Sequence, residues 1–566
     1  MTIPESPRNH AVRSTSHPHV LAYNPDIVGR VKRWGVLVIL AVAQFVMVLD
    51  STVMNVSISQ VASDLDTTIT GMQAAITFYT LTMAAFMLTG GKLGDRWGRA
   101  RAFRIGAVVY GVGSLVTALS PNLTVLLLGW SLVEGLGAVL VIPAIAALAA
   151  INYDGRARVT AFSALGAVTG LAAAAGPLIG GLVTTYASWR FVFVGETIVM
   201  IAILLASRSI KDVAADRSLR IDVGSVVLSA GGMALVVFGV LQSKTWGWFV
   251  PLAPPKIGSV EIAPLGVSPV TYLILLGAIV LWWFGQRQRR LVETGRVPLL
   301  KVSLFRIGAL RSGLSGFLVQ YFAIASLFFV IPVYLQTMQG YDALGTGVKI
   351  LPLSVGLIVF SAVGSWLTSR RSARRIAQTG QATMATGLLF VLVAIRPELA
   401  GWPFAIGMFV VGAGFGLLAS QLGNVNMSAV ERGDSSEVGG LQGTFQNLGS
   451  SFGTAVVGSV FILLLAGGFT TAVSENTGIS AEQQALVTTA IEGAVPIVSQ
   501  DEAERLVREG GGSAEVAAEV AQDYADSQIE ALQQAIFIVF ALLVISLLLS
   551  RNLPARVGAA ASTDDG

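Results

Sequence analysis

The sequence predicts an all-α membrane protein in which fourteen spanning helices form two six-helix bundles plus an inserted two-helix hairpin. Three observations predict this fold class. Of the 566 residues, 54% are hydrophobic and only 12% are charged, whereas about a quarter of the residues in soluble domains are charged. Apolar runs of spanning length recur along the chain. A charged motif after the second run has a weaker echo after the tenth.

The apolar runs are close to the roughly 20 residues that cross about 30 Å of hydrocarbon as a helix. They lie at 34–60, 70–91, 102–120, 123–149, 158–183, 189–207, 222–243, 269–285, 311–336, 344–369, 376–395, 402–424, 438–467 and 531–550. Most of the 37 lysine and arginine residues fall in the two tails and in the loops after even-numbered runs. This bias predicts that both termini are cytoplasmic.

The charged and sulfur-bearing residues exclude several classes of protein. The net charge of +4 is spread over separate loops, so it does not indicate nucleic-acid binding. The absence of cysteine excludes disulfides and thiol chemistry. All three histidines, His10, His17 and His19, lie in the polar N-terminal tail, so we expect no histidine metal site inside the membrane. The tail is too long and too polar for a signal peptide, and we expect it to be retained.

The charged motif divides the chain into two equivalent parts. "GGKLGDRWGRARAF" at 90–103 has its echo in "SWLTSRRSARR" at 365–375. Counting six runs back from the echo assigns runs 1–6 and 9–14 to the two bundles and leaves runs 7 and 8 as the insertion. The predicted parts are a cytoplasmic tail at 1–33, a bundle at 34–207, a linker with the inserted helices at 208–310, a second bundle at 311–550 that includes an extracytoplasmic loop at 468–530, and a cytoplasmic tail at 551–566.

Three motifs resemble those of a known family, and the resemblance covers nearly the whole chain. "GKLGDRWGRAR" is similar to the loop 2–3 signature of the major facilitator superfamily. "AAAAGPLIGG" at 172–181 resembles the fifth-span motif of its drug:proton antiporters. "LDSTVMNV" at 49–56 is similar to the first-span motif of the fourteen-span drug:proton antiporter family, which includes quaternary-ammonium and multidrug exporters. The resemblance implies the major facilitator fold and proton-coupled efflux of lipophilic, cationic compounds by alternating access.

The same resemblance implies a secondary active transporter in a bacterial cell membrane, driven by the proton gradient without a cofactor. Its expected partners are a lipophilic small molecule, protons and the lipid bilayer, with no nucleic acid, and we expect a monomer. We do not expect an enzyme, because the sequence has no catalytic triad pattern, zinc motif or phosphate loop. "GAGFG" at 412–416 lies within an apolar run, where it is typical of helix packing.

The charged loop 2–3 has the residues for a contact that can open. Gly91 and Gly98 permit a tight turn, and Asp95 and Arg99 lie four residues apart, where they can pair on one helical turn. Surface pairs of this kind contribute only about 0 to 1 kcal/mol. The resemblance implies that Asp95, Arg96 and Arg99 hold the cytoplasmic side closed. The alternative is that the arginines only set the topology.

The fifth run carries the antiporter motif, whose residues are Gly170, Gly176, Pro177, Gly180 and Gly181. Small residues let another helix approach closely, and a proline removes a backbone hydrogen bond and bends the helix. The resemblance implies that this bend favours exchange over uniport. Tight helix packing alone is the alternative.

Three carboxylates lie inside apolar runs: Asp50 in run 1, Glu134 in run 4 and Glu196 in run 6. Each costs about 2.5 to 3.5 kcal/mol on insertion scales, so it persists mainly where it is paired, hydrated or protonated. A carboxyl group in hydrocarbon favours its neutral form, and a group that changes its charge can couple proton entry to the release of a cationic substrate. The alternative is that the acids bond the polar residues of 51–55 and serve only helix packing.

The fourth run departs from the family pattern. The family usually has an arginine three residues before a glutamine, and this chain has Ser131 and Glu134 at those places. The change favours a protonated resting site and cationic substrates, and it removes the arginine of the familiar relay. A fourth acid, Asp222, lies at the inner mouth of run 7, where we expect interfacial solvation.

The second bundle offers aromatic and amide side chains but no acid in mid-membrane. Aromatic faces can bind lipophilic cations through cation–π and apolar contact. The expected pocket residues are Asn55 from the first bundle and Gln320, Tyr321, Phe328, Tyr334, Gln336, Gln421 and Asn424 from the second. The alternative is that these aromatics face lipid or core.

The segment 468–530 carries twelve acidic and two basic residues, with a helical pattern such as "DEAERLVREG". We expect it outside the membrane, where it either biases the outer mouth electrostatically or forms a solvated hairpin.

Two other functions stay open from the sequence. One is a proton-coupled exporter of a metabolite, lipid or siderophore. The other is a membrane receptor that transports nothing, in which the buried acids would have no coupling role.

Overall fold

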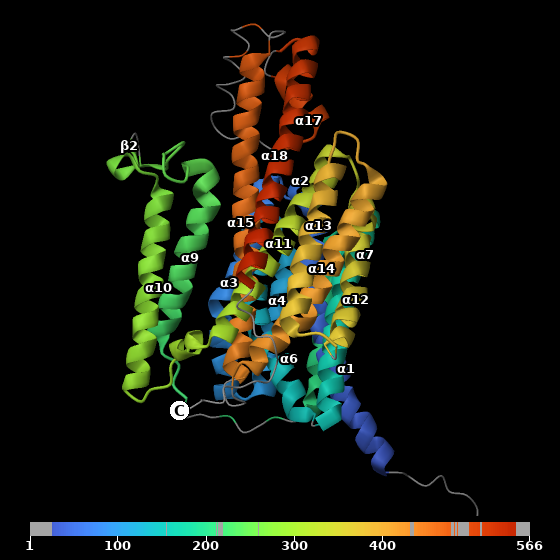
Figure 1. The fold of residues 1–566 in the computed structure, drawn as a ribbon, viewed down its shortest axis with the longest axis vertical. Coiled ribbons are helices and arrows are strands. Elements are labelled where there is room, and N and C mark those ends of the chain that lie inside the picture. Colours follow the sequence, from blue (N-terminus) through green and yellow to red (C-terminus); the bar gives the residue numbers. More distant parts are fainter. Residues whose placement is uncertain are drawn as a thin grey trace, which may run out of the picture.

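The computed structural model describes residues 25–550 with gaps at 154, 211, 213–214, 216–218, 258–259, 369, 431–434, 477–479, 481–483, 485–496 and 510–511. The described chain is a bundle of long helices that run roughly along one axis (Figure 1). The three histidines of the N-terminal tail lie outside the described residues. Below, the basic end means the end that carries residues 92–101 and 370–375, and the opposite end carries residues 59–68 and 339–342.

The first half of the chain forms one group of helices. Its elements are α1 (Pro25–Val56), α2 (Ile58–Asp64), α3 (Ile69–Trp97), α4 (Arg99–Ala118), α5 (Leu123–Leu126), the π-helix η1 (Leu127–Glu134), α6 (Gly135–Asn152), α7 (Gly155–Tyr186), α8 (Arg190–Ala206) and the short turn η2 (Ser207–Ser209). Gly98 separates α3 from α4 with a φ of 96°, a conformation that favours glycine.

The inserted hairpin and the second half follow. The hairpin comprises α9 (Val223–Trp246), the strands β1 (Lys256–Ile257) and β2 (Val260–Glu261), the turn η3 (Pro264–Gly266) and α10 (Pro269–Glu293). The strands are antiparallel, with Lys256 opposite Glu261. The second half comprises η4 (Val302–Arg306), α11 (Gly308–Val333), the π-helix η5 (Tyr334–Met338), α12 (Ala343–Leu367), α13 (Ala373–Ala394), α14 (Gly401–Ser428), α15 (Ser435–Glu475), α17 (Gln500–Glu509) and α18 (Ala514–Leu549).

The two halves meet along two helix pairs. α3 packs against α15, and α7 packs against α12. Gln73 of α3 donates to the Thr454 carbonyl of α15 at 2.9 Å, and Ser354 of α12 donates to the Ala173 carbonyl of α7 at 3.3 Å. Polar side chains bonded to the facing backbone therefore supplement the apolar packing between the halves.

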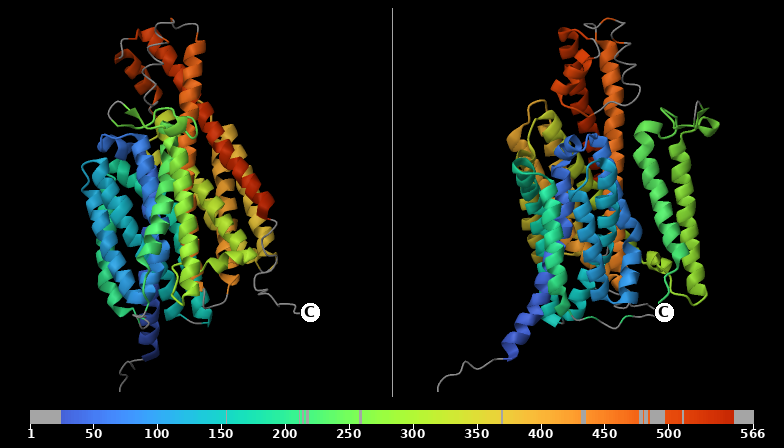
Figure 2. Two further views of the ribbon diagram at one scale, coloured as in Figure 1. Left: turned by 90° about the vertical axis from the view of Figure 1, so that its left-hand side faces the viewer. Right: turned by 180° about the vertical axis from the view of Figure 1, so that it is seen from behind.

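The inserted hairpin stands beside this bundle, as Figures 1 and 2 show from several sides. α9 contacts α3 and α15, where Val240 and Leu241 pack with Ala455 and Phe78. α10 lies on the outer side of α9, and only 17% of its most apolar stretch is buried. The hairpin is thus attached through one of its two helices along most of its length.

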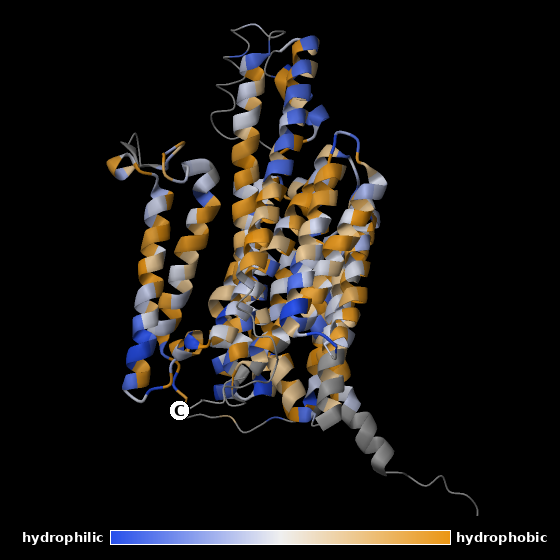
Figure 3. Cartoon of the chain, in the orientation of Figure 1, coloured by the Kyte–Doolittle hydropathy of each residue, from blue (hydrophilic) through white to orange (hydrophobic). Residues whose placement is uncertain are grey.

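Twelve of the described helices are long and apolar enough to cross a membrane. Figure 3 shows their hydrophobic middles and more hydrophilic ends. Helices also occupy the other two predicted runs, but α8 has only 17 residues, and α4 begins with Arg99, Arg101 and Arg104. The predicted count of fourteen spans therefore stays a prediction, while the all-α membrane fold is confirmed.

At the opposite end, α15 and α18 extend beyond their predicted runs and rise above the other helices together with α17 (Figure 1). Tyr524 and Gln528 of α18 bind the backbone of Val498, just before α17, at 3.1 and 2.9 Å. The helices continue past the predicted end of the first of these runs, at 467, and begin before the predicted start of the second, at 531, because their polar extensions are also helical. Much of the predicted loop, including 485–496, lies outside the described residues.

Candidate functional site

The three predicted acids come together inside the first half of the chain. Asp50 lies on α1, Glu134 ends the π-helix η1, and Glu196 lies on α8. One carboxylate oxygen from each lies within 4.8 Å of the others. Their side chains are 0%, 0% and 3% exposed. We call these residues the acidic triad.

Few donors face the acidic triad among the described residues. The indole Nε1–H of Trp130 donates to Oδ1 of Asp50 at 2.9 Å. On α4, the hydroxyls of Tyr110 and Ser114 donate to Oε2 of Glu196 at 3.3 and 3.4 Å. The other four oxygens are buried and have no hydrogen-bond partner within the described part of the chain. They are Oδ2 of Asp50, both oxygens of Glu134 and Oε1 of Glu196. A buried polar atom without a partner is costly, so this group is not arranged for structural stability alone.

The local alternative for Asp50 is wrong. Ser51 and Thr52 donate to the carbonyls of Val48 and Leu49 at 3.0 and 2.8 Å, and Asn55 donates to the carbonyl of Ser51 at 2.6 Å. Because these side chains bond the backbone of α1 itself, they do not satisfy the carboxylate. The hydrogen bond that Asp50 accepts comes instead from Trp130.

The π-helix η1 places Trp130 and Glu134 against their neighbours. π-Helical turns are rare and occur frequently at functional sites. Trp130 stacks on Tyr79 of α3, with 4.7 Å between ring centroids and an angle of 8°. On α4, a Cβ at Gly113 would lie 2.7 Å from Cα of Glu134, so this glycine permits the close approach of η1. Sequence reasoning missed Trp130 and Tyr110, because the apolar runs that hold them carry no sign of this contact.

The acidic triad can hold protons or a small cation. Carboxylate oxygens at this spacing form a group that could hold a metal ion, and hard cations prefer oxygen ligands. The same oxygens can also be neutralised by protons. The expectation that the protein uses no cofactor therefore stays a prediction.

The antiporter motif lies at the junction of α7 with α1 and α12. A Cβ at Gly176 would meet Thr52 of α1, and one at Gly180 would lie 2.9 Å from Val53. Gly181 lies against Ala343 at the start of α12, and Gly170 faces the side chain of Leu357 further along it. Pro177 lies inside α7, and its carbonyl faces Gly347 of α12. The motif thus lets α7 pack closely on both halves, while its role in exchange stays a prediction.

The predicted gating motif spans the end of α3 and the start of α4. Arg99 is 8% exposed and pairs with Asp95, and it also donates to the Gly91 carbonyl at 3.1 Å. This pairing four residues apart is as expected, although Arg99 is more buried than a surface residue. A Cβ at Gly98 would lie 2.6 Å from the Asp212 carboxylate. The role of this motif in gating stays a prediction.

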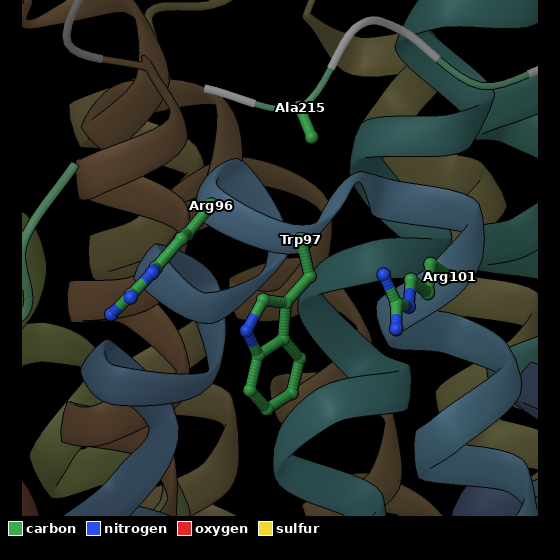
Figure 4. Close-up of a pocket in the computed structure, with 4 residues that line it drawn as sticks. All are labelled: Arg96, Trp97, Arg101 and Ala215. Carbon is green, nitrogen blue, oxygen red and sulfur yellow. The ribbon is translucent and has the colours of Figure 1, made fainter. Parts of the chain in front are cut away.

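Arg96 lies in the last turn of α3, three residues before Arg99. With Trp97, Arg101 and Ala215 it lines a pocket of about 260 Å³ at the basic end (Figure 4). Arg96 and Arg101 lie on either side of the indole in this view. Its volume is slightly below the roughly 300 to 1,000 Å³ of typical small-molecule sites, and it lies at the basic end rather than beside the acidic triad.

The structure places the expected pocket residues in different surroundings, and their role in binding stays a prediction. Tyr334 donates to the Arg396 carbonyl at 2.8 Å, and Gln421 donates to the Gly364 carbonyl at 3.1 Å. Gln336 bonds the Val56 carbonyl at 2.7 Å. All three side chains therefore make structural contacts. The side chain of Asn424 lies outside the described residues.

Two of the expected pocket residues, Gln320 and Tyr321, have surroundings suited to contact with a ligand. Gln320 is 2% exposed, and neither its amide nitrogen nor its amide oxygen has a hydrogen-bond partner among the residues that the structure describes. Tyr321 follows it, stacked on Phe317 and edge-on to Phe415 at centroid distances of 5.8 and 5.9 Å. Phe328 is partly buried against the apolar core.

Comparison with known proteins identifies the family. The Major Facilitator Superfamily profile matches residues 40–454. The chain belongs to the major facilitator superfamily. Members of this superfamily are membrane transporters, and the chain is accordingly a multi-pass membrane transporter rather than an enzyme.

Several curated relatives of this superfamily member come from bacteria. It is 28% identical to a probable actinorhodin transporter of Streptomyces coelicolor, over 78% of this chain and 75% of that protein. It is 29% identical to a puromycin resistance protein of Streptomyces alboniger, over 76% and 82%. It is 23% identical to the multidrug resistance protein Stp of Mycobacterium tuberculosis, over 75% and 74%.

Solved structures agree with the superfamily fold. A bacterial homologue of the human lysosomal transporter Spinster, in an inward-facing and unoccupied conformation, matches with a TM-score of 0.59 and 13% identity, over 92% of this chain and 98% of that one. A D-xylose–proton symporter matches with a TM-score of 0.52 and 13% identity, over 75% and 90%. At such identities, the likeness shows the fold alone.

Proposed function

We propose that this transporter is a proton-coupled antiporter that exports lipophilic, cationic compounds from a bacterial cell by alternating access. The observation that carries the proposal is the acidic triad, whose three buried carboxyl groups lie within 4.8 Å of one another. A secondary transporter needs a site whose charge changes during the cycle, and intramembrane acids are typical of such sites.

The spacing of the triad supports proton binding. Two unit charges 4 Å apart repel by about 4 kcal/mol even at an effective dielectric constant of 20. Three ionised carboxylates would therefore repel strongly in this buried site, and protonation removes the repulsion. Entry of water or movement of α1, η1 or α8 would separate the acids and allow protons to leave.

The relatives support drug-like substrates. The relatives are named for resistance to puromycin, for multidrug resistance, and for tetracenomycin C resistance and export. The stacked Tyr321 and the unpartnered Gln320 offer an aromatic face and an amide on the second half, which suit an organic cation with a polar group. Protons then bind the acidic triad in the first half, and the substrate contacts both the first half and the aromatic and amide side chains of the second half.

A dye-efflux experiment tests the coupling. Inverted membrane vesicles containing the full chain expose its cytoplasmic face, so a fluorescent cationic dye is added outside, a pH gradient with an acidic lumen is imposed, and dye uptake reports export. We expect collapse of the gradient to stop transport. We also expect Asp50→Asn and Glu134→Gln to reduce transport at least tenfold, with dye binding retained in at least one of the two variants.

Asp66→Asn is the matched control for these substitutions. Asp66 is exposed, lies outside the triad and has a φ of 48°, a conformation that asparagine tolerates. The variant should transport as the wild type does. Transport that persists with ATP and no gradient would contradict the proposed mechanism.

A metabolite exporter is the second candidate function, because one relative is named a probable actinorhodin transporter. A substrate panel of dye cations and uncharged or acidic aromatic metabolites separates the two. Gradient-driven export confined to the uncharged or acidic compounds would favour the second candidate.

A further inference from the structure

Glu437, in the first turn of α15, joins three parts of the molecule at the basic end. Its side chain is 6% exposed, and its Oε2 lies 3.8 Å from Nζ of Lys92 on α3. Its Oε1 accepts a hydrogen bond from the backbone N–H of Lys301. α3 belongs to the first half and α15 to the second, while Lys301 lies in the segment that connects the inserted hairpin to α11. One carboxylate thus contacts both halves and the hairpin connection.

Gln288 holds the same segment to the hairpin. Its side chain is 0% exposed on α10, and its Oε1 accepts hydrogen bonds from the N–H groups of Leu299 and Leu300 at 2.8 and 3.2 Å. Its Nε2 donates to Oγ of Ser225 on α9 at 2.7 Å. Bonds therefore run from both hairpin helices through residues 299–301 to Glu437.

An apolar cluster surrounds these polar contacts. It joins α3, α10, the connecting segment, α11 and α15, and its buried members are Leu88, Phe284, Leu299, Leu300, Leu304, Leu310, Leu314, Val438 and Leu441. Separating α3 from α15 at this end would break the contact between Lys92 and Glu437 and expose part of the cluster. Burial of this apolar surface consequently favours the closed basic end.

We propose that the segment 298–304 couples the inserted hairpin to closure of the basic end, with Glu437 and Gln288 as positioning residues. The Lys301 N–H holds Glu437 where it faces Lys92, and Gln288 holds the segment that carries this N–H. The hairpin thereby biases the alternating-access equilibrium toward the state with a closed basic end. This inference rests on the alternating access proposed above, and it assigns a role to the insertion that the acidic triad does not explain.

Distance measurement between two spin labels tests the coupling. The chain has no cysteine, so Arg208→Cys and Arg375→Cys place labels at exposed positions on the first and second halves at the basic end. Lys301→Pro removes the N–H that Glu437 accepts, and Lys301 has a φ of −75°, which proline adopts. Lys301→Ala is the control, because it removes the same side chain and keeps the N–H.

The expected result is a shift toward longer distances in the proline variant alone. Loss of one hydrogen bond to a charged group should raise the population with an open basic end about tenfold relative to Lys301→Ala. Lys92→Gln should produce a similar shift. The double variant Lys92→Gln with Lys301→Pro should have nearly the same open population as either single variant, because both substitutions act through Glu437. Equal distances in the proline and alanine variants, or fully additive shifts, would overturn the inference.

A second pair of variants covers the case in which the proline variant does not fold. Gln288→Met removes the acceptor at similar size, and Gln286→Met makes the same change two residues away on α10. Only Gln288→Met should lengthen the distances, and equal behaviour of the two would overturn the inference. The distance between the two spin labels is measured without substrate and without a pH gradient. Loss of coupling in the dye experiment with a normal distance response would therefore reject the proposed function and leave the hairpin contact standing.

Discussion

Trp130 donates a hydrogen bond to Asp50 and so links this acid to the helix that carries Glu134. Asp50 is predicted from the sequence as a buried carboxylate, but its partner lies 80 positions away on the π-helix. The indole donates one hydrogen bond and stacks on Tyr79 with the same ring system. Because the donor and the stack belong to one side chain, the position of Asp50 depends on how η1 packs.

Trp130→Phe should reduce gradient-driven efflux about tenfold, because a buried acceptor that loses its partner costs about 1–3 kcal/mol. Phenylalanine keeps an aromatic ring against Tyr79, so we expect the protein to remain folded. The measurement is the initial rate of dye uptake into energised inverted vesicles, which corresponds to efflux from the cell.

Trp189→Phe provides the comparison for this prediction. Trp189 also donates its Nε1–H to an aspartate, Oδ2 of Asp64, at 3.0 Å, but it does so away from the triad. Its replacement should leave the efflux rate within about twofold. Equal losses in the two variants would show that the Trp130 hydrogen bond has no special role.

Helix α7 packs closely against two neighbouring helices because its glycines have no side chains. Its glycines face α1 on one side and α12 on the other, so the same helix contributes to packing within the first half and to contact between the halves. The motif was predicted to allow close approach, and the structure shows which helices approach.

Gly176→Ala should lower the stability of the folded protein by about 1–3 kcal/mol, because the added Cβ overlaps Thr52 of α1. Gly166→Ala on the same helix meets nothing within 4 Å and should be neutral or stabilising, since alanine favours helix over glycine. Thermal unfolding in detergent measures both. A Gly176→Ala variant as stable as Gly166→Ala would contradict the packing argument.

Asp222 stabilises the start of α9 in two ways. Its Oδ2 caps the helix by accepting a hydrogen bond from the Ser225 N–H at 2.8 Å. Its two carboxylate oxygens also accept hydrogen bonds from Nε and Nη2 of Arg287 on α10, at 2.6 and 2.8 Å. The Arg287 guanidinium, with help from Ser225, holds the pKa of the Asp222 carboxyl well below its usual range. A lowered pKa in the folded state stabilises the fold above the unfolded value of about 4, and this stabilisation is lost as the pH falls through the folded value.

Asp222→Ala should therefore speed amide hydrogen exchange in the first turn of α9 at pH 7, since loss of a helix cap costs about 0.5–2 kcal/mol. Asp222→Asn retains a capping side chain and should show a smaller change, from loss of the ion pair alone. Mass spectrometry after deuterium labelling reads residues 223–226. Identical exchange in all three proteins would contradict this account.

Polar contacts join the two halves of the molecule at both of its ends. At the basic end Lys92 faces Glu437, and at the opposite end Gln336 of η5 donates to the Val56 carbonyl at 2.7 Å and accepts from Ser59 N at 3.3 Å. The proposed alternating access requires that one of these contacts breaks while the other holds.

Gln336→Leu should favour opening of the opposite end, because it removes the two hydrogen bonds that Gln336 makes with the first half. A Ser59→Cys reporter in the cysteine-free chain should then react several-fold faster with a water-soluble maleimide. Gln339→Leu is the control, because Gln339 binds Pro397 and Leu399 within the second half. Unchanged labelling in Gln336→Leu would show that this contact does not restrain opening.

The sequence by itself determined the membrane class, the helical runs and the three acids, because hydrocarbon imposes composition on each segment independently of its neighbours. It also predicted the pairing of Asp95 with Arg99, since four residues span one helical turn. Only the tertiary structure decided that Asp50, Glu134 and Glu196 share one site, that Trp130 serves Asp50, and that Glu437 links the hairpin to both halves. These contacts join residues far apart in the chain, and apolar runs that look alike do not specify which of their faces meet.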